Sequence, residues 1–182
     1  MGLFLCARHH SGESHGSWAL DGFLREFAYG RSPETRWLRA NGSVLVAPFV
    51  DLDGVVEGMY GKDRVPVDFN RDWSANPVRP EIRRLQLEIG AWAKKVHYAA
   101  HLDFHCPCLP HVHHMHSSVP GQSTAKLKDV ERELARELAR LSPRDSRFFE
   151  KDLLFPGYQG ASGETTCAAY QRHVYGVLSL TP

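Results

Sequence analysis

Short apolar runs alternate along this chain with longer segments of helical periodicity, and this alternation limits the fold more than any other feature. Residues 2–8 and 43–50 are apolar and bounded by turn residues, and residues 97–104 form a mixed run. We expect each of them to be a strand. Because helical patterns lie between them, the sequence predicts an α/β fold with a mainly parallel or mixed twisted sheet flanked by helices. Active sites of such sheets lie beyond the carboxyl ends of the strands.

Three segments have the periodicity of amphipathic helices. Residues 17–29 place apolar side chains near one face, and residues 79–96 repeat them at steps of three and four. Residues 125–141 give the clearest pattern, with one apolar stripe that predicts packing against the core. The stripe consists of Leu127, Val130, Leu134, Leu138 and Leu141. Residues 51–76 are instead rich in Gly, Asp and Arg and predict a long loop, and loops of this length are usually functional.

Composition places the chain among globular proteins and argues against several partners. A length of 182 residues suits a single domain, which we predict over residues 1–182. Lys and Arg number 22 against 21 Asp and Glu, so the net charge of +1 creates no field that would attract nucleic acid or an anionic membrane. No apolar stretch approaches the roughly 20 residues of a membrane-spanning helix. The four cysteines form no regular framework, which favours a reducing compartment, and we expect the cytoplasm.

A histidine and a glutamate stand where the first predicted strand ends. His10 and Glu13 form an H-x-x-E pattern, a spacing that lets an imidazole and a carboxylate reach one cation. His105 follows the last predicted strand, so the sheet would bring it to the same edge. A catalytic zinc takes three protein ligands and leaves one position for water. These three residues are therefore a candidate zinc site, and the alternative is that they only form hydrogen bonds at the surface.

The long loop ends in a polar group next to an aromatic residue. Asn70 and Arg71 offer adjacent donors that suit a carboxylate, and charge-assisted bonds of this kind are strong when shielded from water. On the residues alone, the simpler interpretation is a surface arginine paired with Asp68 or Asp72.

Three motifs, in this order, resemble the zinc metallocarboxypeptidases, in particular the cytosolic-carboxypeptidase-like branch and its bacterial members. Residues 7–24 contain A-R-H-H-S-G-E, S-W and G-F-L, where the family has A-R-x-H-P-G-E, S-W and G-F-L. Residues 53–71 contain D-G-V and D-F-N-R, which resemble N-P-D-G-V and D-x-N-R. Residues 103–107 read D-F-H-C-P, which resembles D-L-H followed by C-P. Three ordered matches are far more specific than any one of them.

The resemblance implies a shortened version of the zinc carboxypeptidase fold and a role for each matched residue around one metal ion. It makes His10, Glu13 and His105 the ligands of a single Zn²⁺. It makes Asp68 the carboxylate that orients the first histidine, because a ligating imidazole usually donates its other N–H to an acceptor.

The resemblance also implies residues that bind the substrate and move protons. Asn70 and Arg71 match the pair that holds the terminal carboxylate of the substrate. The general base of the family is a glutamate near the end of the domain, for which Glu164 is the candidate here. A cation in the long loop stabilises the oxyanion, and of Arg64 and Lys62 we prefer Arg64 because a guanidinium holds an oxyanion without losing its charge.

The implied function is a zinc-dependent metallocarboxypeptidase that hydrolyses the C-terminal peptide bond of a peptide or protein through a metal-activated water. One alternative is a zinc-dependent deacylase of N-acyl amino acids that uses the same site. Another is an inactive metal-binding remnant, which the short chain and the histidines at 111–116 suggest. Those histidines could bind a second metal ion, although we expect them to be solvated loop residues.

The chain also departs from the family pattern. Family catalytic domains are longer, with strands before the H-x-x-E segment, which here begins close to Met1. We therefore expect the first strand to lack its edge neighbours, so that it is exposed or covered by a second copy of the chain in a homo-oligomer. A truncated gene product would account for this difference.

Overall fold

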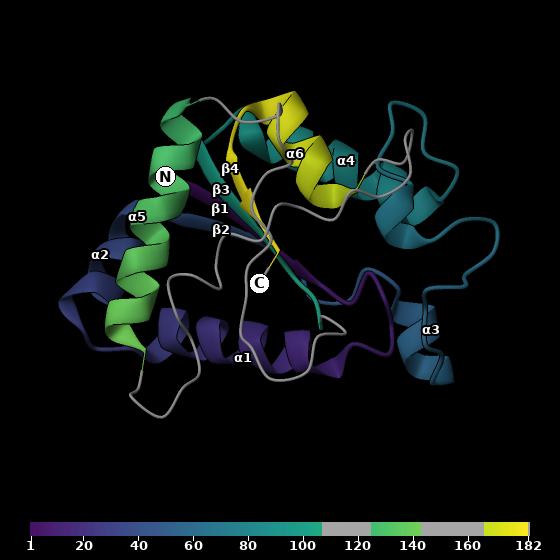
Figure 1. The fold of residues 1–182 in the computed structure, drawn as a ribbon, viewed down its shortest axis with the longest axis horizontal. Helices are drawn as coiled ribbons and strands as arrows, with labels where there is room; N and C mark the ends of the chain where they lie inside the picture. Colours follow the sequence, from purple (N-terminus) through teal and green to yellow (C-terminus); the bar gives the residue numbers. More distant parts are fainter. Residues whose placement is uncertain (107–124, 143–165, 182) are drawn as a thin grey trace.

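The computed structural model describes residues 1–106, 125–142 and 166–181. A parallel sheet of four strands lies at the centre of this part of the chain (Figure 1). The strands are β1 (Gly2–Ala7), β2 (Ser43–Ala47), β3 (Tyr98–Phe104) and β4 (Leu178–Leu180), in the order β2-β1-β3-β4. The α/β class, the parallel sheet and the three predicted strands are confirmed, and β4 is a strand that the sequence analysis did not predict.

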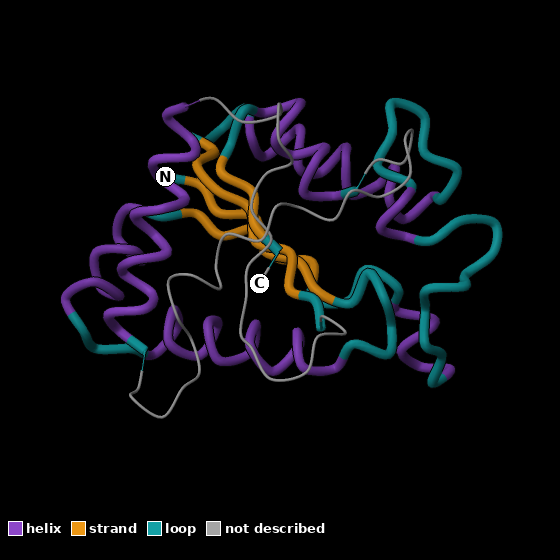
Figure 2. The backbone as a smooth tube through the Cα atoms, in the orientation of Figure 1, coloured by secondary structure: helices purple, strands orange, loops and turns teal. Residues whose placement is uncertain are grey.

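Helices connect the strands and cover both faces of the sheet (Figures 1 and 2). In chain order they are α1 (Ser14–Tyr29), α2 (Pro33–Asn41), α3 (Leu52–Glu57), the 3₁₀ turn η1 (Phe69–Arg71), α4 (Pro80–Ala93), α5 (Ala125–Leu141) and α6 (Cys167–Tyr175). The three predicted helices correspond to α1, α4 and α5. The loops that follow β1, β2 and β3 all leave the sheet at the same end, as parallel strands require (Figure 2).

Helices α2 and α3 lie in segments where the sequence analysis expected no helix, and both begin with a capping side chain. Ser32 precedes α2 and accepts a hydrogen bond from the backbone N–H of Thr35. Asp51 precedes α3, inside the predicted long loop, and accepts from the N–H of Gly54 at 3.0 Å. A side chain that satisfies an otherwise unpaired N–H of the first turn typically stabilises a helix by about 1 kcal/mol.

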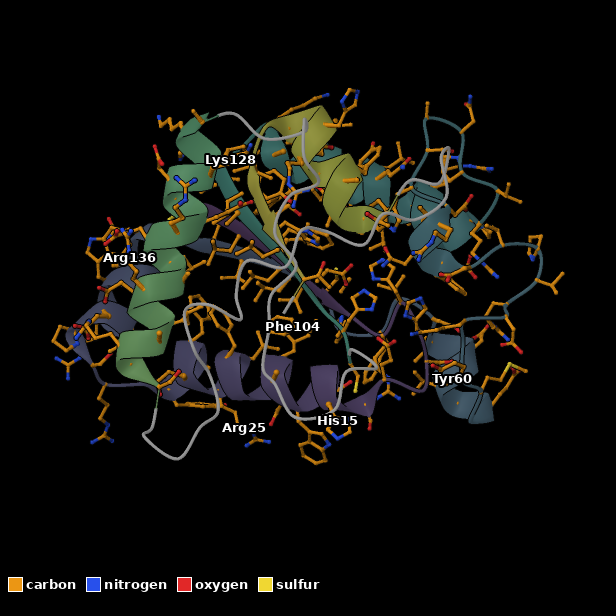
Figure 3. All side chains as sticks on the ribbon, viewed as in Figure 1. His15, Arg25, Tyr60, Phe104, Lys128 and Arg136 are labelled. Atoms are coloured by element: carbon orange, nitrogen blue, oxygen red, sulfur yellow. The ribbon has the colours of Figure 1, made fainter. Side chains whose placement is uncertain are left out.

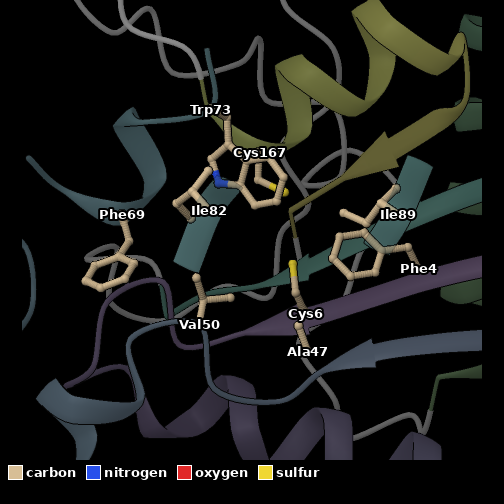
Figure 4. Packing of buried hydrophobic residues seen from close by; sticks show 9 residues of the cluster. All are labelled: Phe4, Cys6, Ala47, Val50, Phe69, Trp73, Ile82, Ile89 and Cys167. Carbon is tan, nitrogen blue, oxygen red and sulfur yellow. The ribbon is translucent and has the colours of Figure 1, made fainter. Parts of the chain in front are cut away.

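The core lies on both faces of β1. Phe4 and Cys6 pack toward α4 and α6, in a cluster that Figure 4 shows with Ile82 and Ile89 of α4. Leu5 belongs to the second cluster, on the opposite face, which includes residues of α1. The last four residues of β1 are completely buried. A strand that is covered on both faces is apolar along its whole length, and this explains why residues 2–8 show no alternation of apolar and polar side chains.

The expectation that β1 lies at an exposed edge is wrong. β1 pairs with β2 on one side and with β3 on the other, so that Cys6 lies opposite both Ala47 and Asp103. The edges of the described sheet are β2 and β4. The helical connections after β1 and after β2 return the chain to opposite sides of β1, and its hydrogen-bonding groups are therefore paired without a second copy of the chain.

Helix α5 packs on the core, as predicted, but through only part of its apolar stripe. Leu134 and Leu138 contact the cluster around Leu180 of β4. Val130 is 42% exposed and Leu141 67% exposed. Within the described residues, none of the helices combines the length and the apolar character that are needed to cross a membrane.

Candidate metal centre

The order of the strands creates a topological switch point at the carboxyl ends of β1 and β3. After β1 the chain moves to one side of the sheet to form β2, and β3 then pairs with the other side of β1. Connections that leave neighbouring strands in opposite directions open a crevice between them, and ligands of α/β proteins bind at such points. His10 and Glu13 follow β1 at this point, and His105 follows β3.

The structure brings the three predicted metal ligands together. His10 Nδ1 lies 3.0 Å from Glu13 Oε1, and His105 Nδ1 lies 2.8 Å from Glu13 Oε2. One donor atom from each residue lies within 4.8 Å of the other two. All three side chains are less than 10% exposed. Residues separated by up to 95 positions therefore present two imidazole nitrogens and a carboxylate to one point.

The imidazole nitrogen that faces away from Glu13 lies close to a second carboxylate in both histidines. His10 Nε2 lies 3.2 Å from Asp68 Oδ2, which is the contact predicted for Asp68. His105 Nε2 lies 3.0 Å from Asp103 Oδ2. Such contacts fix the tautomer and the ring orientation of a ligating histidine. The sequence analysis gave Asp103 no role, although the D-x-H spacing contained a signal, because residues two apart on a strand share a face.

Neighbouring charges shift the pKa values of Glu13 and His105 strongly. Burial alone would raise the pKa of the Glu13 carboxyl, but the hydrogen bonds from His10 and His105 hold it well below its usual range. Burial would lower the pKa of His105, but the carboxylates of Asp103 and Glu13 raise it to about 9. The centre is thus a set of negative groups that attracts positive charge.

This donor set fits a divalent metal ion. Two histidines and one glutamate form the ligand set of several catalytic zinc sites. Both imidazoles turn the same nitrogen, Nδ1, toward the Glu13 carboxylate, while Asp68 and Asp103 hold their other nitrogens. In the absence of metal, protons on the two imidazoles face the Glu13 carboxylate. A divalent cation among these atoms would replace those protons as the partner of the negative charge.

Backbone contacts set the distance between the two parts of the centre. A Cβ atom on Gly16, in the first turn of α1, would lie 2.5 Å from the carbonyl oxygen of Phe104. Figure 3 labels Phe104, at the end of β3, and His15, the neighbour of Gly16 at the start of α1. Gly61 has a φ of +98°, and a Cβ there would lie 2.4 Å from the backbone nitrogen of Ser11. Both glycines therefore allow main-chain segments to meet closely beside the ligands.

Asn70 and Arg71 lie beside the centre on η1. The Asp68 side chain caps this turn by accepting from the N–H of Asn70 at 2.7 Å. Asn70 Oδ1 accepts from the N–H of Cys167 at 2.9 Å, and its Nδ2 lies 3.2 Å from His105 Nε2. Arg71 donates to the carbonyl of Asn70 at 3.0 Å. The structure thus places Asn70 next to His105, with Arg71 against the backbone of Asn70.

Of the two cations that were considered for the oxyanion, Lys62 contacts the centre. Its Nζ lies 3.1 Å from Glu13 Oε1. Arg64, which the sequence analysis preferred, is instead paired through Nε with Asp51 Oδ2 at 3.2 Å, and Asp51 is completely buried. Arg64 also lies 3.6 Å from a carboxylate oxygen of Glu57. The remaining candidates, Glu164 and the histidines at 111–116, lie outside the described residues.

Comparison with known proteins gives relatives in both sequence and structure. Mouse cytosolic carboxypeptidase 1 is 37% identical over 76 residues, which are 41% of this chain and 6% of that protein. Human cytosolic carboxypeptidase 2 is 41% identical over 71 residues, which are 39% of this chain and 8% of that protein. The chain therefore spans less than a tenth of the length of these curated relatives. No protein-family model matches it.

Solved structures resemble nearly the whole chain. A metallo-carboxypeptidase from Burkholderia cenocepacia has a TM-score of 0.78 at 24% identity, covering 99% of this chain and 46% of that one. A metallo-carboxypeptidase from Pseudomonas aeruginosa, in complex with (2-guanidinoethylmercapto)succinic acid, has a TM-score of 0.68 at 21% identity, covering 100% and 47%. The succinylglutamate desuccinylase from Chromobacterium violaceum has a TM-score of 0.61 at 15% identity, covering 99% and 51%. The chain has the fold of about half of each of these proteins.

Proposed function

We propose that this chain forms a zinc-dependent centre that hydrolyses the C-terminal peptide bond of a peptide or protein. The motifs of the sequence predict this activity, and the similarity to carboxypeptidases in sequence and in fold supports it. The observation that carries the proposal is the convergence of His10 Nδ1, the Glu13 carboxylate and His105 Nδ1 at the carboxyl ends of β1 and β3. Their relation to Asp68 and Asp103 supports it, because these carboxylates hold the imidazoles in the orientation that a ligand needs.

In this proposal His10, Glu13 and His105 hold the zinc ion. When bound, zinc lowers the pKa of a water molecule toward ~7 and polarises a carbonyl group. Asp68 holds His10 through Nε2, while Asp103 and the Asn70 amide lie at 3.0 and 3.2 Å from His105 Nε2, so that both rings keep Nδ1 turned toward Glu13. Without these carboxylates both rings would be free to turn or to change tautomer.

The substrate is held by groups around the ligands. Arg71 and the second N–H of the Asn70 amide bind the terminal carboxylate of the substrate, and this places the last peptide bond at the centre. Lys62, at 3.1 Å from Glu13, provides the positive charge for the oxyanion. Glu164 remains our candidate for the general base that accepts the proton of water and later protonates the leaving amine.

Metal content tests the centre directly. Elemental analysis of the purified chain should find zinc, and His105→Ala should lose most of the ion that the centre holds. His97→Ala is the matched control, because His97 is an exposed histidine just before β3 and should leave the metal content unchanged. Equal zinc in wild type and His105→Ala, after dialysis against a weak chelator, would remove the third ligand and with it the proposal.

Assays on two substrate classes separate the proposed activity from its alternative. The chain should release the last amino acid from a peptide and should act poorly on an N-acyl amino acid of the same residue. The reverse preference would make it a deacylase, and zinc binding without either activity would make it a metal-binding remnant. We also propose that the chain is cytoplasmic, which agrees with its three described cysteines, Cys6, Cys106 and Cys167, being thiols rather than disulfides.

A further inference from the structure

A second group of metal-binding side chains lies inside the sheet, below the centre at the strand ends. Cys6 lies within β1, Cys167 begins α6, and His101 lies within β3. Their side chains are completely buried. Figure 4 shows the two cysteines approaching the same part of the core from different elements. The Cys6 sulfur lies 3.3 Å from His101 Nε2, and the Cys167 sulfur lies 3.5 Å from the same nitrogen.

Contacts on the other side of the imidazole prepare His101 to act as a ligand. His101 Nδ1 lies 2.7 Å from the hydroxyl oxygen of Ser179, its register partner on β4. When Nδ1 donates its proton to this hydroxyl, Nε2 presents a lone pair to both sulfur atoms. A ligating histidine typically has this arrangement, with one nitrogen on the metal and the other on a hydrogen-bond acceptor. The ring also stacks on Phe4 with centroids 5.0 Å apart, which fixes its plane.

The distances among these atoms match those around a tetrahedral ion. With metal–sulfur bonds of about 2.3 Å and metal–nitrogen bonds of about 2.0 Å, two ligand atoms at the tetrahedral angle lie about 3.5 Å apart. Both sulfur–nitrogen distances, 3.3 and 3.5 Å, agree with this value. Asp103 Oδ1 lies 3.4 Å from the Cys6 sulfur and supplies an oxygen on the same side. Ligand atoms of Cys6, Cys167 and Asp103 lie within 4.8 Å of one another.

We propose that Cys6, Cys167 and His101 bind a thiophilic metal ion, Zn²⁺ or Cu⁺, with Asp103 as the neighbouring oxygen donor. Thiolate and imidazole ligands select these ions over Mg²⁺ and Ca²⁺. Binding of a zinc ion replaces the two thiol protons, which leave to solvent as two H⁺, while two metal–sulfur bonds form. His9 is not included, because its Nδ1 contacts Asp103 at 2.9 Å and its Nε2 accepts a hydrogen bond from Trp73 at 3.0 Å.

We call Cys6, Cys167 and His101 the sulfur cluster. Asp103 would connect it with the strand-end centre of His10, Glu13 and His105. Its Oδ1 faces the Cys6 sulfur and His9, and its Oδ2 faces His105. An ion in the sulfur cluster would therefore stabilise the carboxylate that holds His105 in place. The ion would be structural, because the ligands are completely buried and no substrate could reach it.

Cobalt substitution distinguishes the two groups of ligands, because only bonds between sulfur and Co²⁺ give an intense charge-transfer band in the near ultraviolet. The full chain, kept reduced and free of oxygen, should show this band when titrated with Co²⁺. Cys6→Ser and Cys167→Ser should lose it. His105→Ala should keep it while losing the ion of the strand-end centre, so that failure of this proposal and failure of the proposed function give different results.

A control variant identifies which cysteines are responsible. Cys106→Ser should keep the band, since Cys106 follows β3 and its sulfur lies 3.5 Å from His15 Nδ1. Circular dichroism shows whether each variant is folded, and if Cys6→Ser does not fold, Cys167→Ala provides the same test from the end of a helix. Absence of the band in wild type, or its persistence in a folded Cys167→Ser, would overturn the proposal.

Competition identifies the ion. Zn²⁺ or Cu⁺ should displace Co²⁺ and abolish the band at stoichiometric amounts, and the more effective of the two is assigned as the native ion. If neither ion displaces cobalt while Mg²⁺ does, the site is not thiophilic and the proposal is wrong.

Discussion

The strand-end centre and the sulfur cluster use the same two strands and have opposite surroundings. His10 and His105 come just after β1 and β3 and are joined by Glu13, beyond the ends of the strands. Cys6 and His101 lie within the same strands, where both faces of the sheet are covered. A shift of a few residues along a strand thus changes the donors from oxygen and nitrogen to sulfur and nitrogen. It also changes the role that a bound ion could have, from catalysis to stability.

The largest effect should come from the residue that contacts both groups. Asp103→Ala removes the acceptor of His9 and His105 in a completely buried position, so the free energy of unfolding should fall by about 3–5 kcal/mol. Urea denaturation measures this change. Asp129→Ala, on the exposed surface of α5, is the control and should change stability by less than about 0.5 kcal/mol. A small effect of Asp103→Ala would show that the two groups are independent.

The next effect concerns the strand-end centre alone. Lys62→Met should lower kcat for peptide hydrolysis about 100- to 1000-fold if Lys62 stabilises the oxyanion, with little change in metal content. Arg64→Met is the comparison, because Arg64 is paired with Asp51, and it should lower kcat much less. Steady-state kinetics of both variants decide between the two cations. A larger loss in Arg64→Met would restore the preference drawn from the sequence.

A smaller effect should follow from the carboxylate that orients His10. Asp68→Asn should weaken zinc binding at the strand-end centre about 10- to 100-fold, because the amide holds the imidazole less firmly than the carboxylate does. Competition with a chromogenic chelator measures the affinity. Asp63→Asn, an exposed change in the same loop, should leave it unchanged. The cobalt band of the sulfur cluster should be the same in both variants.

The smallest effect is expected for Ser179, which contacts the second nitrogen of His101 as Asp68 contacts that of His10. Ser179→Ala removes the neutral hydroxyl beside His101 Nδ1, which should cost about 1 kcal/mol of stability. Cobalt should bind to the cluster less tightly, but by a smaller factor than zinc loses in Asp68→Asn, since a hydroxyl orients an imidazole less strongly than a carboxylate. Unchanged cobalt affinity in Ser179→Ala would indicate that His101 is held by packing on Phe4 alone.

Local sequence patterns were sufficient for most of the fold and for the ligand set. The apolar runs predicted β1, β2 and β3, and family motifs identified His10, Glu13 and His105, because each run and each motif consists of residues close together in the chain. The short helix α2 was missed, although Ser32 and Pro33 form a helix start, because its few apolar residues give a weak periodic signal. The position of β1 between its neighbours depends on pairing across the chain, which local patterns do not contain.

Long-range contacts explain what could not be predicted in the site. The pairing of Arg64 with Asp51 and of Lys62 with Glu13 depends on how the long loop folds back over β1. The sulfur cluster joins positions 6, 101 and 167, which share no motif, and the pairing of β1 with β3 together with the packing of α6 places them together. Asp103 was visible in the D-x-H pattern, but its contact with His105 was not.

The close approach of Gly16 to Phe104 restricts how this protein can change during evolution. Helix α1 tolerates many side chains on its exposed surface, yet at position 16 even a methyl group would collide with the main chain of β3. Because that contact determines how far Glu13 lies from His105, a mutation at position 16 would separate two ligands without altering either. A harmful variant in a related gene could therefore occur at a residue that takes no part in the chemistry.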